Sequence, residues 1–214
     1  NQSAQLQAAA AEVSYKVGDI DAAISSLAKA VEDPKSDERI FALYTKLLID
    51  HRDSSQAWSA LQALKGKESP SVSAGIGYLQ VLRKSYEEAE ETLQVVAAGD
   101  GLDSYTQALG LYALAEVNTH FLKDFTPGDS TDELAEWVTL MELAEQSYLR
   151  VIRTGQSKWG AASLNRLAAL SKYTSETIIT FKPPSELSSS DQKRFAQGFK
   201  QRSTILKNQQ AQSL

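Results

Sequence analysis

Residues 15–34 read YKVGDIDAAISSLAKAVEDP, and this stretch decides how the rest of the chain is interpreted. A first helix runs into Gly18 and Asp19, a tight turn follows, and a second helix starts at Ile20. Apolar and small residues then recur at the i, i+3, i+4, i+7 spacing of a single buried helix face, until Pro34 ends the pattern. We therefore expect two helices joined by a tight turn, the second of them amphipathic, and a third helix that Asp37 caps.

The turn and the helix after it recur along the chain. Ala23, Ala57 and Ala89 each follow a short turn at the same offset, so the copies are separated by 34 and 32 residues. The positions four and seven residues after each alanine are apolar in all three copies, namely Leu27 and Ala30, Leu61 and Leu64, and Leu93 and Val96. A period of this length, made of two antiparallel helices, is typical of a solenoid.

These residues resemble the tetratricopeptide repeat (TPR) family. The turns at 18–20 (GDI) and 84–89 (KSYEEA) match the turn of the family. Small residues stand where neighbouring helices of the family approach closely, namely Ala11, Gly77 and Gly110. The second copy departs from the pattern, because Thr45 replaces the small residue and 52–54 (RDS) replaces the glycine turn. The tryptophan expected in the first helix is missing from the first three copies.

The resemblance implies an all-α, right-handed superhelical solenoid of antiparallel helix pairs, with four to five repeats and a C-terminal helix. Repeats are expected at 4–37, 38–69, 70–102 and 103–155, the last with an inserted loop at 123–132. Residues 156–214 are expected to form an extended helix, a Pro-Pro linker and a polar helix capped by Ser190. This tail has a weaker resemblance to the later repeats of large extracytoplasmic TPR proteins of gram-negative bacteria.

Composition narrows the class of protein. The chain has 214 residues, of which 42% are hydrophobic and 23% charged, as in ordinary soluble proteins. The net charge of −5 argues against a general nucleic-acid binder, and no apolar run is long enough for a transmembrane helix. The absence of cysteine excludes disulfides and thiolate metal sites. It is compatible with the cytoplasm and with export, and we favour a periplasmic or other extracytoplasmic location.

No residue pattern predicts catalysis. The only histidines, His51 and His120, lie 69 residues apart without a neighbouring metal-ligand motif, and no serine sits in a G-x-S-x-G turn. The aspartates of 124–132 lack the spacing of a calcium loop, and no phosphate-binding loop occurs. We therefore expect no enzyme activity, no metal and no cofactor.

Without a catalytic or metal-binding pattern, we expect the function to depend on the surface of the protein. By the resemblance, the first helices line a concave groove, and the side chains expected to face it are Tyr15, Arg39, Lys46, Tyr78, Gln107 and Leu111. We expect a non-enzymatic scaffold that binds a partner protein or peptide there, within a multiprotein assembly. Packing of Tyr15 and Tyr78 against neighbouring helices is an equal alternative for these two side chains. Two other functions stay open: a structural segment of a longer TPR protein, which self-associates or stacks through its terminal repeats, and a helical small-ligand regulator or enzyme.

Overall fold

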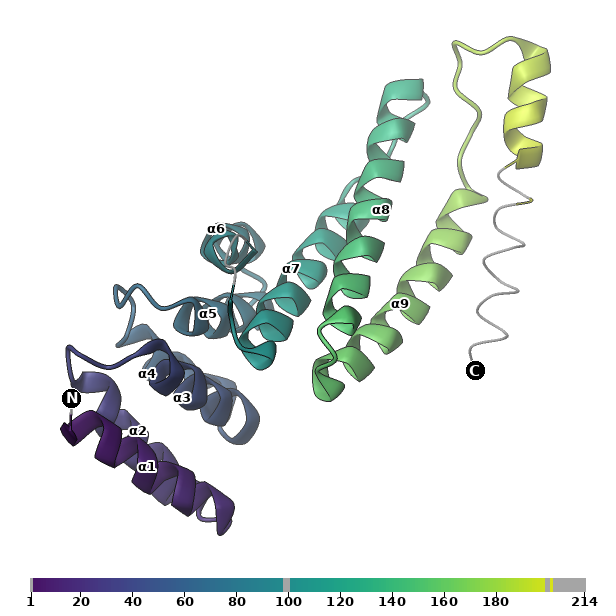
Figure 1. Cartoon of the computed structure of the whole chain (residues 1–214). Helices are drawn as coiled ribbons and strands as arrows, with labels where there is room; N and C mark the ends of the chain where they lie inside the picture. Colours follow the sequence, from purple (N-terminus) through teal and green to yellow (C-terminus); the bar gives the residue numbers. More distant parts are fainter. Residues whose placement is uncertain (1, 98–100, 199–200, 202–214) are drawn as a thin grey trace. The chain divides into compact units, whose positions relative to one another are not determined.

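The computed structural model describes residues 2–97, 101–198 and 201, and within them the chain is all-helical (Figure 1). The helices are α1 (Gln2–Lys16), α2 (Ile20–Glu32), α3 (Glu38–His51), α4 (Ser54–Gln62), α5 (Pro70–Leu82), α6 (Tyr86–Ala97), α7 (Ser104–Asp124), α8 (Thr131–Arg153) and α9 (Ser157–Ile178). A further helical stretch covers 189–198. The chain divides into two compact units, Asn1–Leu114 and Ala115–Leu214, so that α7 contributes to both.

Side-chain caps explain where several helices begin. The carboxylate of Asp19 accepts a hydrogen bond from Ala22 N at 3.0 Å, which satisfies a free amide at the start of α2. Asp37 caps α3 in the same way through Ile40 N, as the sequence predicts. Each cap follows a short connection, so the chain reverses direction and consecutive helices pack side by side.

Two tight turns use the left-handed backbone region. Gly18, between α1 and α2, has a φ of +84°, which glycine adopts without steric cost. The equivalent position between α5 and α6 is Lys84, whose φ is +63°. The first and third copies of the turn therefore share one backbone geometry, and at Lys84 a lysine bears the left-handed strain, whereas Arg52 of the second copy is extended with a φ of −115°.

The first unit is a row of helix pairs. Helix α1 packs against α2, α2 against α3, α3 against α4 and α5, and α5 against α6. The repeated alanines Ala23, Ala57 and Ala89 are at most 1% exposed, because each lies where its helix meets a neighbour. The apolar positions four and seven residues later are also buried in all three copies. The periodic pattern of the sequence is therefore the pattern of core contacts.

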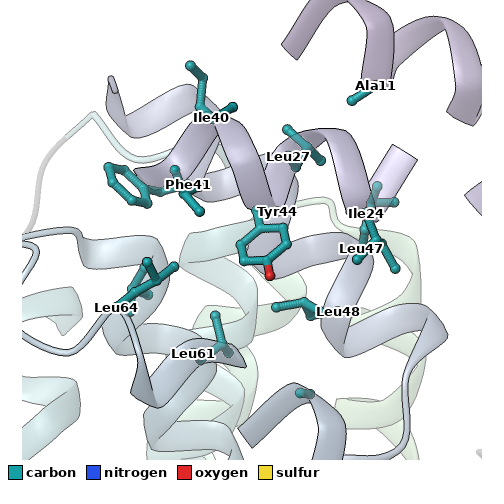
Figure 2. Packing of buried hydrophobic residues seen from close by; sticks show 14 of the residues in the cluster. Ala11, Ile24, Leu27, Ile40, Phe41, Tyr44, Leu47, Leu48, Leu61 and Leu64 are labelled. Carbon is teal, nitrogen blue, oxygen red and sulfur yellow. The ribbon is translucent and has the colours of Figure 1, made fainter. Parts of the chain in front are cut away.

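One apolar core runs through these pairs. Leu27 of α2, Leu47 of α3 and Leu61 of α4 are fully buried in it, and Figure 2 shows Tyr44 lying among the leucines of these helices. Burying one such side chain contributes about 1.5–3 kcal/mol. Because α1, α2, α3, α4 and α5 all give residues to the same cluster, the pairs stabilise one another.

Glycines allow the closest helix contacts. A Cβ on Gly75 of α5 would lie 2.6 Å from Leu61 Cδ1 of α4 and 2.7 Å from Thr45 Cγ2 of α3. A Cβ on Gly77 would lie 2.5 Å from Leu93 Cγ of α6, and one on Gly110 would collide with Val96. The predicted close approach at Gly77 and Gly110 is confirmed. Gly75 adds a close contact on the opposite side of α5, which the repeat pattern of the sequence did not predict.

The second unit joins the end of α7 to α8 and α9. Trp137, Met141 and Tyr148 of α8 are at most 1% exposed and form its interior. Glu116 of α7 accepts hydrogen bonds from the Tyr148 hydroxyl at 2.7 Å and from Arg166 Nε of α9 at 2.8 Å. One carboxylate therefore ties all three helices of this unit together.

The second half differs from the expected layout. The interruption predicted at 123–132 is shorter, because α7 continues to Asp124 and α8 begins at Thr131. The extra length of this region lies in the helices themselves. The predicted cap at Ser190 is wrong: Ser188 Oγ accepts from Asp191 N at 3.2 Å and is the capping hydroxyl. The later part of the expected C-terminal helix lies outside the described residues, apart from residue 201.

The close approach at α5 gives a direct test. Gly77→Ala should lower the free energy of unfolding, because overpacking Leu93 costs about 1–3 kcal/mol and exceeds the helix-propensity gain of about 0.5–1 kcal/mol. Gly160→Ala in α9 is the matched control, since its Cβ would meet no atom within 4 Å. That control should raise stability. Urea denaturation measures both, and equal effects of the two changes would contradict the packing described for α5.

Candidate functional site

All six side chains predicted to face a groove lie in the first unit, on helices α1, α3, α5 and the first part of α7. They do not form one continuous cluster. The structure joins Tyr15 to Lys46 directly and places Arg39, Tyr78, Gln107 and Leu111 in separate surroundings. The candidate site is therefore best built from Lys46 outward.

Lys46 of α3 lies between two aromatic rings. Its Nζ donates to the Tyr15 hydroxyl at 3.3 Å and lies 5.1 Å from the centroid of that ring. The same Nζ lies 5.6 Å from the ring centroid of Tyr105, on α7. Both distances fit cation–π attraction. Three helices that are far apart in the sequence thus place side chains around one ammonium group.

Asp50 completes this arrangement. It lies one turn after Lys46, and its Oδ2 is 3.8 Å from Lys46 Nζ. Its Oδ1 accepts a hydrogen bond from the Tyr105 hydroxyl at 2.7 Å. We call Tyr15, Lys46, Asp50 and Tyr105 the Lys46 cluster. The side chains of Lys46 and Asp50 are 29% and 17% exposed, so solvent screens their attraction only in part.

Sequence reasoning missed Asp50 and Tyr105. The spacing of Lys46 and Asp50 is the i, i+4 spacing at which opposite charges on a helix pair, and it was available as a signal. No spacing in the sequence connects Tyr105 to Asp50, because the two residues lie 55 positions apart in the chain. Next to the cluster, the ring of His51 meets Tyr15 edge-on at 6.3 Å.

Arg39 borders a separate cleft between α1 and α3. It forms an ion pair with Glu12 of α1 at 2.9 Å, and its side chain is 82% exposed. The cleft has a volume of about 300 Å³ and is lined on the α1 side by Gln5 and Ala9, and on the α3 side by Leu43. An exposed pair of this kind contributes about 0–1 kcal/mol, so another carboxylate can replace Glu12 at low cost.

The remaining predicted residues have different surroundings. Tyr78 is half-buried, and its ring lies 6.5 Å from that of Tyr112 of α7, so helix packing accounts for much of its surface. Gln107 is exposed. Leu111 is only 5% exposed and has almost no surface to offer a partner. Of these three, Gln107 is the side chain best placed to contact a partner.

A second polar network joins three of the same helices. Glu38 of α3 accepts from the backbone N of Ser71 on α5 at 2.8 Å, and the Ser71 hydroxyl lies 2.8 Å from Thr106 Oγ1 of α7. Ser71 and Thr106 are at most 2% exposed. This network fixes α3, α5 and the start of α7 to one another, and so it holds Tyr105 in place for the Lys46 cluster.

Tyr44, in the core of the first unit, has a shifted pKa. Burial raises the pKa of the Tyr44 phenol above its ordinary value, with the Glu32 carboxylate acting in the same direction and the Arg52 guanidinium opposing both. A higher pH is therefore needed to ionise Tyr44 than an ordinary tyrosine. The phenol has a packing role in the core rather than an acid–base role.

The described residues show no arrangement typical of a metal centre. Residues 2–97, 101–198 and 201 contain no group of three or more histidine and acidic side chains that could hold a metal ion. His120 lies beside the ring of Phe121, with 5.8 Å between the ring centroids. Nor does any helix in this part of the chain combine the length and apolar character needed to span a membrane.

A scan against models of known protein families gives no match, and a search of curated proteins gives none either. The surface of the first unit must therefore be interpreted from its own geometry.

The Lys46 cluster makes a stability prediction. Lys46→Met keeps most of the side-chain length but removes the charge between Tyr15, Tyr105 and Asp50. The free energy of unfolding should fall by about 1–2 kcal/mol, the range of partly buried cation–π and charged contacts. Lys65→Met, at an exposed position, is the control and should change it by less than about 0.5 kcal/mol. Chemical denaturation compares the two, and equal small effects would contradict the cluster.

Proposed function

We propose that this chain is a non-enzymatic scaffold of the TPR type, which binds a partner protein or peptide on the face formed by α1, α3, α5 and the first part of α7. The observation that carries the proposal is the convergence of α1, α3 and α7 side chains in the Lys46 cluster. The buried repeated alanines and the close helix contacts at glycine support the repeat interpretation.

The chemistry of this face suits a protein partner. Tyrosine and arginine are enriched among residues that dominate binding energy, because they combine a large contact area with polar groups. Tyr15 is held by Lys46, so its ordering cost is met before binding, while Tyr105, which is only 5% exposed, supports Lys46 and Asp50 rather than contacting the partner. Arg39 supplies an exposed guanidinium whose present partner is readily exchanged. We infer that the partner presents a carboxylate to Arg39.

The proposal predicts which positions touch the partner. A photo-crosslinking amino acid at Gln107, on the proposed face, should capture a specific partner from an extract of the source cells. The same amino acid at Gln94, an exposed glutamine on the second helix α6, is the matched control and should not capture it. Arg39→Ala combined with Tyr78→Ala should then weaken binding to the identified partner at least about tenfold, equivalent to 1.4 kcal/mol.

Folding must be separated from binding in this test, because Tyr78 packs against Tyr112. Arg39→Gln alone changes an exposed side chain and should weaken binding with little change in the melting temperature, because the ion pair that it removes contributes only about 0–1 kcal/mol. Unchanged affinity in both variants, or equal crosslinking from Gln107 and Gln94, would show that the partner does not use this face.

An exposed apolar stripe favours a second function, stacking against another helix pair. Leu6 and Val13 of α1, and Val17 directly after it, are 71%, 62% and 75% exposed. Their i, i+7, i+11 spacing places them on one side of the helix. Within a row of helix pairs, such a surface is what a neighbouring pair covers. A structural segment that assembles with further repeats would use α1 in this way.

Stacking can be measured by thermal unfolding. If the natural protein has repeats adjacent to α1, including them should raise the melting temperature of the 214-residue chain by several degrees, because they bury the stripe. Val13→Gln should remove part of that gain, while Val95→Gln, at a 53% exposed position of α6, should leave it intact. A melting temperature that does not respond to the added repeats would count against stacking at α1.

A further inference from the structure

A pocket lies in the second unit, whereas the Lys46 cluster belongs to the first. It has a volume of about 490 Å³, within the range of about 300–1,000 Å³ that is common for ligand pockets. One wall is the connection 125–129 between α7 and α8. The other is the end of α9 with residues 180–182, including Tyr173 and Thr177. Two short segments without regular structure thus face each other across it.

Hydrogen bonds hold these two walls in place. The backbone N of Ser185 donates to the carbonyl of Asp129 at 3.0 Å. Glu186 Oε2 accepts from both the hydroxyl and the backbone N of Thr131, at 2.9 and 3.3 Å. These bonds join the α7–α8 connection to the chain that follows α9. The pocket is therefore formed before any ligand arrives.

The α7–α8 connection is also fixed from within. Ser130 and Glu133 form a reciprocal capping interaction at the start of α8, with Glu133 N donating to Ser130 Oγ at 3.2 Å and Ser130 Oγ donating to Glu133 Oε2 at 2.9 Å. A Cβ on Gly128 would lie 2.5 Å from Glu133 Oε2. The backbone at Gly128 therefore packs directly on the capping carboxylate.

Aromatic rings give the pocket its apolar character. Phe125, Tyr173 and Phe181 line it and are half-buried. Phe181 is held from behind by the fully buried Trp137, whose ring meets it edge-on with centroids 4.8 Å apart and an interplanar angle of 89°. Lys123 Nζ lies 5.5 Å from the Tyr173 ring centroid. The rings are supported in position, and part of each remains available to a ligand.

The two walls carry opposite charges. Asp129 belongs to the α7–α8 connection and Lys182 to the segment after α9, and both line the pocket. Both are exposed, and within 2–97, 101–198 and 201 neither forms an ion pair. A ligand that carries a basic group on one side and an acidic group on the other can form an ion pair with Asp129 and another with Lys182.

The hydroxyl oxygens of Thr177 and Thr180, which line the pocket, are free to accept hydrogen bonds from a ligand because their protons are already donated to the backbone. Thr177 Oγ1 donates its proton to the carbonyl of Tyr173 at 2.8 Å, and Thr180 Oγ1 donates to the carbonyl of Thr177 at 2.7 Å. Their oxygen lone pairs can still accept from a ligand. Amide N–H groups, which recur along a peptide backbone, provide such donors.

We propose that this pocket binds a short extended peptide segment that carries an aromatic side chain between an acidic and a basic residue. The aromatic side chain packs among Phe125, Tyr173 and Phe181 in offset or edge-to-face contacts, which are worth about 0.5–1.5 kcal/mol beyond their buried area. The acidic residue pairs with Lys182, the basic residue with Asp129, and backbone amides donate to the threonine hydroxyls. This is a second site, independent of the face proposed in the first unit.

The test uses the full chain and a blocked pentapeptide, Glu-Ala-Phe-Ala-Lys, followed by two-dimensional amide NMR. Saturable shifts should concentrate at 125–129 and 173–182, with a dissociation constant of about 0.1–1 mM for so short a probe. Tyr173→Ala should weaken binding at least about tenfold, whereas Tyr173→Phe keeps the ring and should retain it. Lys182→Glu should weaken binding, and Arg39→Ala in the first unit should not.

Two further probes distinguish the ligand class. Glu-Ala-Ser-Ala-Lys lacks the aromatic ring and should bind at least about tenfold more weakly. Free phenylalanine has the ring and both charges but no peptide backbone, and it should also bind more weakly. Equal binding of either probe, no saturable binding of the pentapeptide, or shifts outside the pocket would overturn the proposal. Amide spectra of the free variants show whether Tyr173→Ala has kept its fold, and Tyr173→Phe and Lys182→Glu decide the outcome if it has not.

Discussion

The arrangement of the first unit depends on two glycines of α5, where neighbouring helices pack directly on the backbone. Gly75 faces α3 and α4, while Gly77 faces α6, so one helix backbone is contacted closely from two sides. Any larger residue would push these neighbours apart, because close-packed interiors absorb even one methyl group poorly. In the same unit, Gly75 lets α5 lie close to α3, and the start of α7 reaches α3 through the hydrogen bond from Tyr105 to Asp50. Side chains of α3, α4 and α6 that pack directly on the α5 backbone thus set how closely these helices approach α5.

The two units use different physical means to hold their helices. In the first, apolar contacts repeat from pair to pair, and polar groups also join the first helices, through the partly exposed Lys46 cluster and through the buried Ser71. In the second, the Glu116 carboxylate connects α7, α8 and α9 by hydrogen bonds. Repetition makes the first unit suited to presenting an extended face. The irregular connection after α7 gives the second unit a local pocket instead.

Sequence reasoning succeeded where the physics is local. The cap at Asp37, the turn at Gly18 and the burial of the repeated alanines follow from neighbouring residues and from helical spacing. It failed where the chain meets itself at long range. Tyr105 had no visible connection to Asp50, and the pocket between 125–129 and 180–182 joins segments about fifty residues apart. Leu111, selected by resemblance, is buried, because the resemblance gives a register but not the packing of this particular chain.

The most direct test of this account is a double-mutant cycle between Asp50→Asn and Tyr105→Phe, followed by chemical denaturation. The hydrogen bond that joins α3 to α7 involves a charged acceptor and is only partly exposed. We predict a coupling free energy of about 1–2 kcal/mol between the two changes. A coupling near zero would mean that α3 and α7 do not share this face, and that the surface assigned to partner binding is not assembled as described.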